Sequence, residues 1–311
     1  MKLRTPLRYL WWGFIVAGLL VGCNMPDANE PPVTPSVEIQ AEVPVQNPTE
    51  TQPEPTPTTA PDPAAAIVNG EEIGQSIYQA HLARYQDAQA QAGTLLATEN
   101  VETSVLDDLI ARLLLAQGAR AGGFVADDVM VADRVAQLTE QVGGTETLAA
   151  WMQAHHYTEE SFRRDLKLEL EAAWMRDQIA NTVPENAEQV LAREILFYNE
   201  VDAIRVYSQL EGGSTFESRI ENYDPNNLGY LGWFPRGYLL ETELEEVAFS
   251  LQPGQYSEVI ESRLGFHILQ VLDYAADRPL SADARLTLQT HALEDWLAQK
   301  RAESQIEIFL P

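Results

Sequence analysis

The pattern of apolar and polar residues between positions 67 and 181 is mostly helical. Apolar side chains recur there every three or four residues, which gives a helix one buried face. Asp127 and Thr158 precede two of these runs and have side chains that cap helix N-termini. Glycines from 118 to 123 are expected to end the second helix. The elements expected are a short strand or turn at 67–73 and five helices, over about 77–85, 105–117, 127–138, 145–155 and 158–181.

The pattern changes after residue 229. Residues 230–234 alternate as in a strand, and Pro-Arg-Gly at 235–237 should turn the chain. Apolar residues at 240, 244, 247 and 248 then have helical spacing. The remaining elements are predicted from the same two patterns, strand-like alternation and helical spacing. They are a helix over 239–249, strands over 256–260 and 266–274 joined by a tight turn at 262–265, an amphipathic helix over 281–302, and an alternating strand at 306–310.

The sequence motifs in this second stretch resemble those of the parvulin family of peptidyl-prolyl isomerases, and the resemblance can be followed from about 192 to 274. The chain has Gly-Tyr-Leu-Gly-Trp-Phe at 229–234, Arg-Gly at 236–237, Ala-Phe at 248–249, Pro-Gly at 253–254 and Gly-Phe-His-Ile at 265–268. The resemblance implies an α+β domain, with a four-stranded antiparallel sheet surrounded by helices. It also implies cis–trans isomerisation of X-Pro bonds.

Three less specific motifs resemble the N-terminal chaperone domain of SurA- and PrsA-type foldases. They are Val-Asn-Gly at 68–70, Leu-Asp-Asp-Leu-Ile-Ala-Arg-Leu-Leu-Leu at 106–115 and Thr-Glu-Glu-Ser-Phe at 158–162. This resemblance implies an all-α chaperone domain at 66–185, with a C-terminal helix and strand at 277–311 packed back on it. The parvulin domain, 186–276, is then an insertion.

The N-terminus has the features of a bacterial lipoprotein signal. Three basic residues precede an apolar run at 10–20, which has the length of a signal-peptide core. The run ends in Leu-Val-Gly-Cys, the lipobox pattern, so residues 1–22 are predicted to be a signal peptide and Cys23 the lipidated residue. An ordinary signal peptide with an incidental cysteine, or an uncleaved anchor, is the alternative. Because Cys23 is the only cysteine, an internal disulfide and a cysteine-based metal site are excluded.

Residues 24–66 carry eleven of the eighteen prolines, seven carboxylates and no Lys or Arg. Such a composition buries too little apolar surface to order itself, so 23–65 is expected to be a disordered tether that reaches on the order of 40 Å. A low-complexity tail without a role is the alternative. Loss of the basic signal residues takes the net charge from −27 to −30. This charge argues against nucleic acid as a partner and favours basic, unfolded clients.

The parvulin resemblance implies a polar centre of two histidines and a Cys or Asp. His267 matches the second histidine, and Asp224 is the best match for the Cys/Asp position, in a loop about four residues short. Glu194 stands where the family has its first histidine; a carboxylate there favours a charged His267. From the residues alone, His267 could instead be a hydrogen-bonded core histidine, and Asp224 a loop cap.

A proline pocket is implied on the strand after 229 and the following helix. It would be formed by Leu231, Leu239 or Leu240, and Leu244, with Trp233 and Phe249 beside them; ordinary core packing is the alternative for each. Isomerisation crosses a barrier of ~18–20 kcal/mol without a covalent step. No nucleophile triad, metal or cofactor is therefore expected, and the remaining histidines lack ligand spacing.

Together these features predict an extracytoplasmic, lipid-anchored folding factor that binds unfolded clients and isomerises their X-Pro bonds, with activity weakened by Glu194. One alternative is a holdase whose parvulin domain is inactive. The other is a structural envelope lipoprotein with one fixed partner. The number of unrelated unfolded proteins that the chain binds distinguishes a structural lipoprotein from a folding factor or a holdase.

Overall fold

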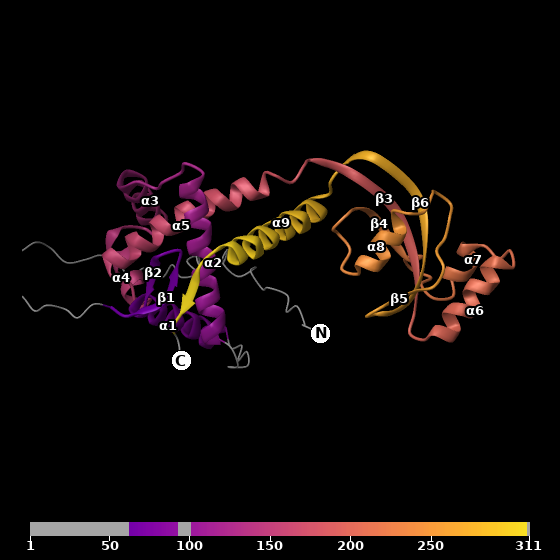
Figure 1. The fold of residues 1–311 in the computed structure, drawn as a ribbon, viewed down its shortest axis with the longest axis horizontal. Coiled ribbons are helices and arrows are strands. Elements are labelled where there is room, and N and C mark those ends of the chain that lie inside the picture. Colours follow the sequence, from indigo (N-terminus) through magenta and orange to yellow (C-terminus); the bar gives the residue numbers. More distant parts are fainter. Residues whose placement is uncertain (1–61, 93–100, 310–311) are drawn as a thin grey trace, which may run out of the picture.

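The computed structural model describes residues 62–92 and 101–309, which form two lobes (Figure 1). The chain leaves the helical lobe after α5 and returns to it through α9, so two segments lie side by side between the lobes. At this connection Asn186 pairs with Pro279, and Leu280 N donates to Glu185 O at 2.9 Å. The predicted signal peptide, Cys23 and most of the predicted tether lie outside the described residues. No helix in the described ranges is both long and apolar enough to cross a membrane.

The five helices predicted in the first half are confirmed. They are α1 Gln75–Ala92, α2 Val101–Ala121, α3 Asp128–Gln141, α4 Thr145–Ala154 and α5 Glu159–Ala180. Both predicted caps are present, since Asp127 accepts from Met130 N, and Thr158 forms a reciprocal capping box with Ser161. The C-terminal helix, α9, runs over Ala282–Glu303 with Ser281 as its N-cap.

The glycines from 118 to 123 end α2 as expected, but the helix continues through Gly118 to Ala121. A Cβ atom built on Gly118 would lie 2.8 Å from the Trp296 ring and 3.3 Å from Met175 Sδ. Glycine therefore lets α9 and α5 approach the last turn of α2 closely. The helix ends at the next pair of glycines, where Gly123 has φ +90°.

The helical lobe is not all-α, since it also holds a three-stranded antiparallel sheet in the order β2-β1-β7. The expected single strand is a hairpin of β1 Ala64–Val68 and β2 Glu71–Gly74. Its turn residues, Asn69 and Gly70, have φ 53° and 84°, the left-handed conformation of a two-residue hairpin turn. The third strand, β7 Ile306–Ile308, is shorter than expected and pairs with β1, so the end of the chain closes this sheet.

The core of the helical lobe is built around α2. Leucines and other apolar side chains on all sides of this helix are buried against α1, α5, the small sheet and α9. From α9, Leu297 is 2% exposed, and Ala292, Leu293 and Trp296 pack beside it. The C-terminal segment is therefore part of this core.

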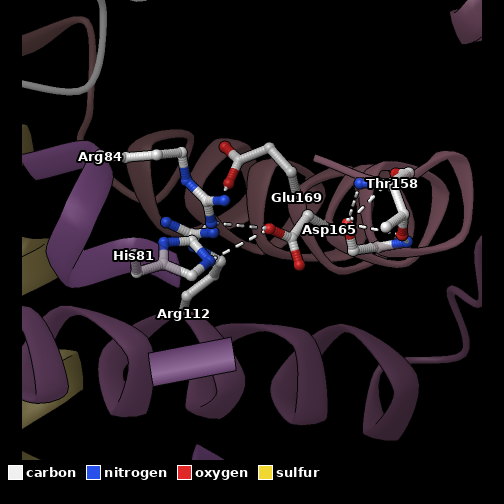
Figure 2. A network of polar contacts seen from close by, with 7 residues as sticks. His81, Arg84, Arg112, Thr158, Asp165 and Glu169 are labelled. Atoms are coloured by element: carbon white, nitrogen blue, oxygen red, sulfur yellow. Dashed lines mark hydrogen bonds and ion pairs between the residues drawn. The ribbon is translucent and has the colours of Figure 1, made fainter. Parts of the chain in front are cut away.

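A buried polar network links α1, α2 and α5 in the same lobe (Figure 2). Asp165 Oδ2 lies 3.1 Å from His81 Nε2 and 3.4 Å from an Arg84 nitrogen, and Arg112 Nε lies 3.7 Å from Glu169 Oε2. Burial lowers the pKa of His81. Burial alone would raise the pKa of Asp165, but the hydrogen bond and charge of His81, with Arg112 and Arg84, bring that pKa below its ordinary value. The network fixes the three helices relative to one another.

The second lobe has the predicted four-stranded antiparallel sheet, in the order β4-β3-β6-β5. The long central strands are β3 and β6; α6 and α7 pack on one face and α8 on the other. The elements are β3 Asn186–Phe197, α6 Glu200–Glu211, α7 Phe216–Ile220, β4 Tyr230–Pro235, α8 Thr242–Ala248, β5 Ile260–Ser262 and β6 Gly265–Pro279.

Two predicted elements of this lobe are shorter than expected. The helix begins at 242, because the Glu245 carboxylate accepts the N–H groups of Gly237, Tyr238 and Leu239 and holds 237–241 as a loop. The strand predicted at 256–260 is reduced to an isolated bridge between Tyr256 and Gln270 and to Ile260, the first residue of β5. Along this segment the Ser257 hydroxyl accepts the Leu269 N–H in place of a strand carbonyl, at 2.9 Å.

Candidate functional site

The sheet face that packs against α8 carries two of the three predicted polar residues, Glu194 and His267. Val190, Ala192 and Glu194 point to this face by strand alternation, and the first two belong to the core under α8. On β6, His267 pairs with Leu196, and Leu269 pairs with Glu194. Glu194 and His267 are therefore diagonal neighbours on adjacent strands, a distance that long side chains bridge.

His267 is fully buried and has partners on both ring nitrogens. Its Nδ1 lies 2.7 Å from Glu194 Oε2, and its Nε2 lies 2.7 Å from Ser262 Oγ. Because a carboxylate only accepts hydrogen bonds, Glu194 holds the proton on Nδ1. The Ser262 hydroxyl can donate to Nε2 of a neutral ring or accept from a charged one, and its oxygen also accepts the Leu264 N–H at 3.0 Å. The imidazole is thus fixed in position and orientation.

Ser262 is the site residue that the sequence analysis missed. The two-residue hairpin between β5 and β6 pairs Ser262 with Gly265 and Ile260 with His267, which puts Ser262 diagonally across from His267. The signal was present in the sequence as a serine five residues before the histidine, across a predicted tight turn. It had no meaning until the register of that turn was known.

These three side chains have the connectivity of a Ser–His–carboxylate triad. The two hydrogen bonds fix the imidazole as a buried polar group on this sheet face. Ser262 Oγ is engaged within its own hairpin by the Leu264 amide, in keeping with a positioning role. Nowhere in 62–92 and 101–309 do three or more His, Cys, Asp or Glu side chains gather as a metal-binding group.

Asp224 caps the loop before β4. One carboxylate oxygen accepts from Asn227 N at 3.1 Å, and the other from Gly229 N at 3.0 Å. This is the loop-cap arrangement that the sequence left open as an alternative. The same loop lies against β3, since Glu194 N donates to Gly229 O at 2.9 Å and a Cβ on Gly229 would clash with the Glu194 carbonyl.

The predicted apolar residues divide into two groups. Leu231, Leu239, Leu244 and Phe249 all pack in the cluster between α8 and the sheet, which also contains Leu269 of the His267 strand. Leu239, rather than Leu240, is thus the leucine of the 237–241 loop that reaches this cluster.

Leu240 and Trp233 do not pack in the cluster between α8 and the sheet. Leu240 is 85% exposed, because the helix that was expected to turn it inward begins only at 242. Trp233 lies on the sheet face opposite to its buried neighbour Phe234, and the Arg278 guanidinium lies 4.4 Å above its ring.

A hollow of about 450 Å³ opens beside Glu194. It is formed by the end of β3, the first turn of α6 and the loop before β4. Three of the predicted site residues line it, namely Glu194, Asp224 and Leu231. The other lining residues are Ile195, Leu196, Phe197, Tyr198, Asn199, Asp202, Tyr223, Asn227, Gly229 and Tyr230.

Two family models match the chain. One, described as SurA-like N-terminal domain, matches residues 53–176, and the other, described as PPIC-type PPIASE domain, matches 200–273. The second match includes Asp224 and His267 but begins after Glu194.

Several curated relatives are similar to the chain. Foldase protein PrsA of Caldanaerobacter subterraneus is 27% identical over 225 residues, which cover 66% of this chain and 72% of the relative. Foldase protein PrsA of Oceanobacillus iheyensis is 31% identical over 139 residues, 43% of this chain and 44% of the relative. Chaperone SurA of Alcanivorax borkumensis is 32% identical over 139 residues, 40% of this chain and 30% of the relative. The chain thus spans most of the first relative and less than half of the other two.

Solved structures were also matched. PrsA from Bacillus cereus is 19% identical with a TM-score of 0.43, covering 78% of this chain and 85% of that one. A PpiC-type peptidyl-prolyl cis-trans isomerase domain is 30% identical with a TM-score of 0.27, covering 30% of this chain and 95% of that one.

Proposed function

Because this chain combines a SurA-like N-terminal domain with a PPIC-type parvulin domain, we propose that it is an extracytoplasmic, lipid-anchored folding factor. Its helical lobe binds unfolded polypeptides, and its second lobe isomerises their X-Pro bonds. The chaperone domain comprises 66–185 and 277–311, and the parvulin domain comprises 186–276. The return of the C-terminal segment to the helical lobe is supported by the pairing of β7 with β1 and the packing of α9 into the core, although β1 begins at Ala64 and β6 runs to Pro279.

The observation that carries the proposal is the geometry of His267. This side chain is fully buried, bonded on both ring nitrogens, and lies within the stretch that the PPIC-type model matches. The same sheet face carries an apolar cluster that includes Leu231, Leu239, Leu244 and Phe249, and we assign the proline ring to this cluster.

The mechanism follows from what the reaction needs. The planar amide must twist across a barrier of ~18–20 kcal/mol, so the site must bind the twisted state more tightly than the planar ones. Leu231, Leu239, Leu244 and Phe249 grip the proline ring and exclude water from the amide, which removes hydrogen bonds that favour planarity. His267 is a positioning residue at the base of this pocket, held by Glu194 and Ser262. Asp224 shapes the pocket wall by capping its loop.

The second candidate is a holdase whose parvulin domain binds X-Pro segments without isomerising them. The observation that favours it is Glu194, which replaces the imidazole of a paired-histidine centre by a carboxylate. The proposed enzyme is accordingly a weak one.

Client breadth tests the folding role. The full chain should suppress aggregation of three unrelated unfolded proteins, since apolar surface and charge recognise chain properties rather than one sequence. Light scattering during refolding at two salt concentrations measures this effect. Suppression of one protein alone, at any ratio, would favour a structural lipoprotein with a fixed partner.

Lipid attachment is tested through the predicted lipobox. Cys23→Ser should move the protein from the detergent phase to the aqueous phase in a Triton X-114 separation, because the thioether-linked lipid would be absent. A matched variant one residue later, Asn24→Ser, should stay in the detergent phase. Unchanged partitioning of Cys23→Ser would contradict the lipid anchor.

A further inference from the structure

The hollow beside Glu194 has three exposed aromatic side chains at its edge. Tyr198 is 86% exposed, Tyr230 48% and Tyr223 41%. The Tyr223 ring is held edge-to-face against Phe197 at a centroid distance of 4.8 Å. On α6, Val201 and Ile204 are also exposed. Exposed aromatic side chains around a cavity are typical of a binding surface.

The charged side chains that line the hollow are all acidic. Glu194, Asp202 and Asp224 are among its thirteen lining residues, which include no Lys, Arg or His. Each carboxylate has a partner: Glu194 bonds His267, Asp202 bonds Asn199 and Arg205, and Asp224 bonds its loop. A carboxylate offers about four acceptor positions, so these contacts leave acceptor capacity on each. The net charge of −27 adds to the negative potential.

The hollow adjoins the proposed proline pocket, because Leu231 belongs to both and Glu194 of the hollow bonds His267. An extended chain advances roughly 3.3–3.6 Å per residue. A client whose proline ring lies against Leu231 therefore places the side chain of a residue one or two positions away at the hollow.

On the basis of the proposed function, we propose that this hollow binds the Lys or Arg side chain of a client residue within two positions of the proline. Tyrosine faces attract cations, and the carboxylates supply charge-assisted acceptors. The proposed isomerase is thus selective for basic X-Pro segments, the segments that an acidic protein also attracts from a distance.

The test uses the full chain and peptides that differ only in the residue before proline, which is Lys, Ala or Glu; a second set varies the residue after it. Binding is measured by fluorescence anisotropy at low and high salt. The set that varies the residue occupying the hollow, either the one before or the one after proline, should show the preference. In that set the Lys peptide should bind roughly five- to tenfold more tightly than the Ala peptide, and the Glu peptide should bind more weakly than both. High salt should reduce these differences.

Variants of exposed residues separate the cation site from general binding. Tyr198→Ala and Asp202→Asn should each weaken the Lys peptide about three- to fivefold, and the Ala peptide by less than twofold. Tyr274→Ala is the matched control, since Tyr274 is an exposed tyrosine that does not line the hollow. Arg205→Ala should tighten Lys binding, because it frees Asp202 from its ion pair.

Equal affinity for the Lys, Ala and Glu peptides in both sets would overturn the inference and leave the proposed isomerase standing. A loss of affinity in Tyr198→Ala that is the same for every peptide would also overturn it, because the hollow would then be an apolar surface only. Failure of every peptide to bind would overturn the proposed X-Pro site itself.

Discussion

Removal of residues 281–311 is expected to unfold the helical lobe and leave the parvulin lobe folded. The deletion takes Leu297, Leu293 and Trp296 out of the core around α2, and removes the strand that pairs with β1. Burial of each such side chain contributes about 1.5–3 kcal/mol, so the loss is comparable with the ~5–15 kcal/mol that stabilises a whole domain. Hydrogen exchange should show loss of protection across α2 while the amides of β3 and β6 stay protected.

A point variant avoids the change in chain length. Leu297→Ala should lower the free energy of unfolding of the helical lobe by ~2–5 kcal/mol. Leu286→Ala, an exposed leucine on the same helix, should cost less than ~1 kcal/mol. Loss of protection mainly in β3 and β6 after the deletion would contradict the assignment of α9 to the helical lobe.

Leu231→Asp is expected to abolish isomerisation, because an unpaired carboxylate in the proline pocket costs several kcal/mol of binding or forces water into the site. Leu240→Asp, the same change at a leucine that is 85% exposed, should retain the activity of the parent. A protease-coupled assay on an X-Pro peptide compares the two, and circular dichroism shows whether both are folded. Equal activity of the two variants would place the proline elsewhere.

Glu194→His should raise the isomerisation rate several-fold, since an imidazole at this position restores the first histidine of the pair and can still bond His267 Nδ1. Aggregation suppression should not change, because that function is assigned to the helical lobe. No gain in rate from a variant that still binds peptide would identify the short Asp224 loop, rather than the missing histidine, as the limit on activity.

Local signals in the sequence were enough for the elements whose causes are local. Thr158 caps α5 because its own hydroxyl reaches the third residue of the helix, and no distant residue is needed to predict this. The same holds for Asp127 and for the periodic runs of α2 and α5. The parvulin motifs also located the sheet, whose four strands and antiparallel pairing agree with the expectation.

The errors arise where distant residues decide the outcome. The sequence did not distinguish Gly118, which lies within α2 against the Trp296 ring, from the glycines at 122 and 123 where the helix ends. Leu240 fits a helical period, but Glu245 binds the amides before it and delays the helix. Ser262 became part of the site only through the register of the β5–β6 hairpin. Each of these three features depends on a tertiary contact, which the spacing of apolar residues along the sequence does not predict.

The central claim is that the second lobe catalyses isomerisation of X-Pro bonds. The most direct test is NMR exchange spectroscopy on a short Lys-Pro or Ala-Pro peptide with a catalytic amount of the full chain. Unaided exchange takes tens to hundreds of seconds. The account predicts faster cis–trans exchange that scales with protein concentration and disappears in Leu231→Asp. Exchange at the unaided rate, with a peptide that demonstrably binds, would contradict it.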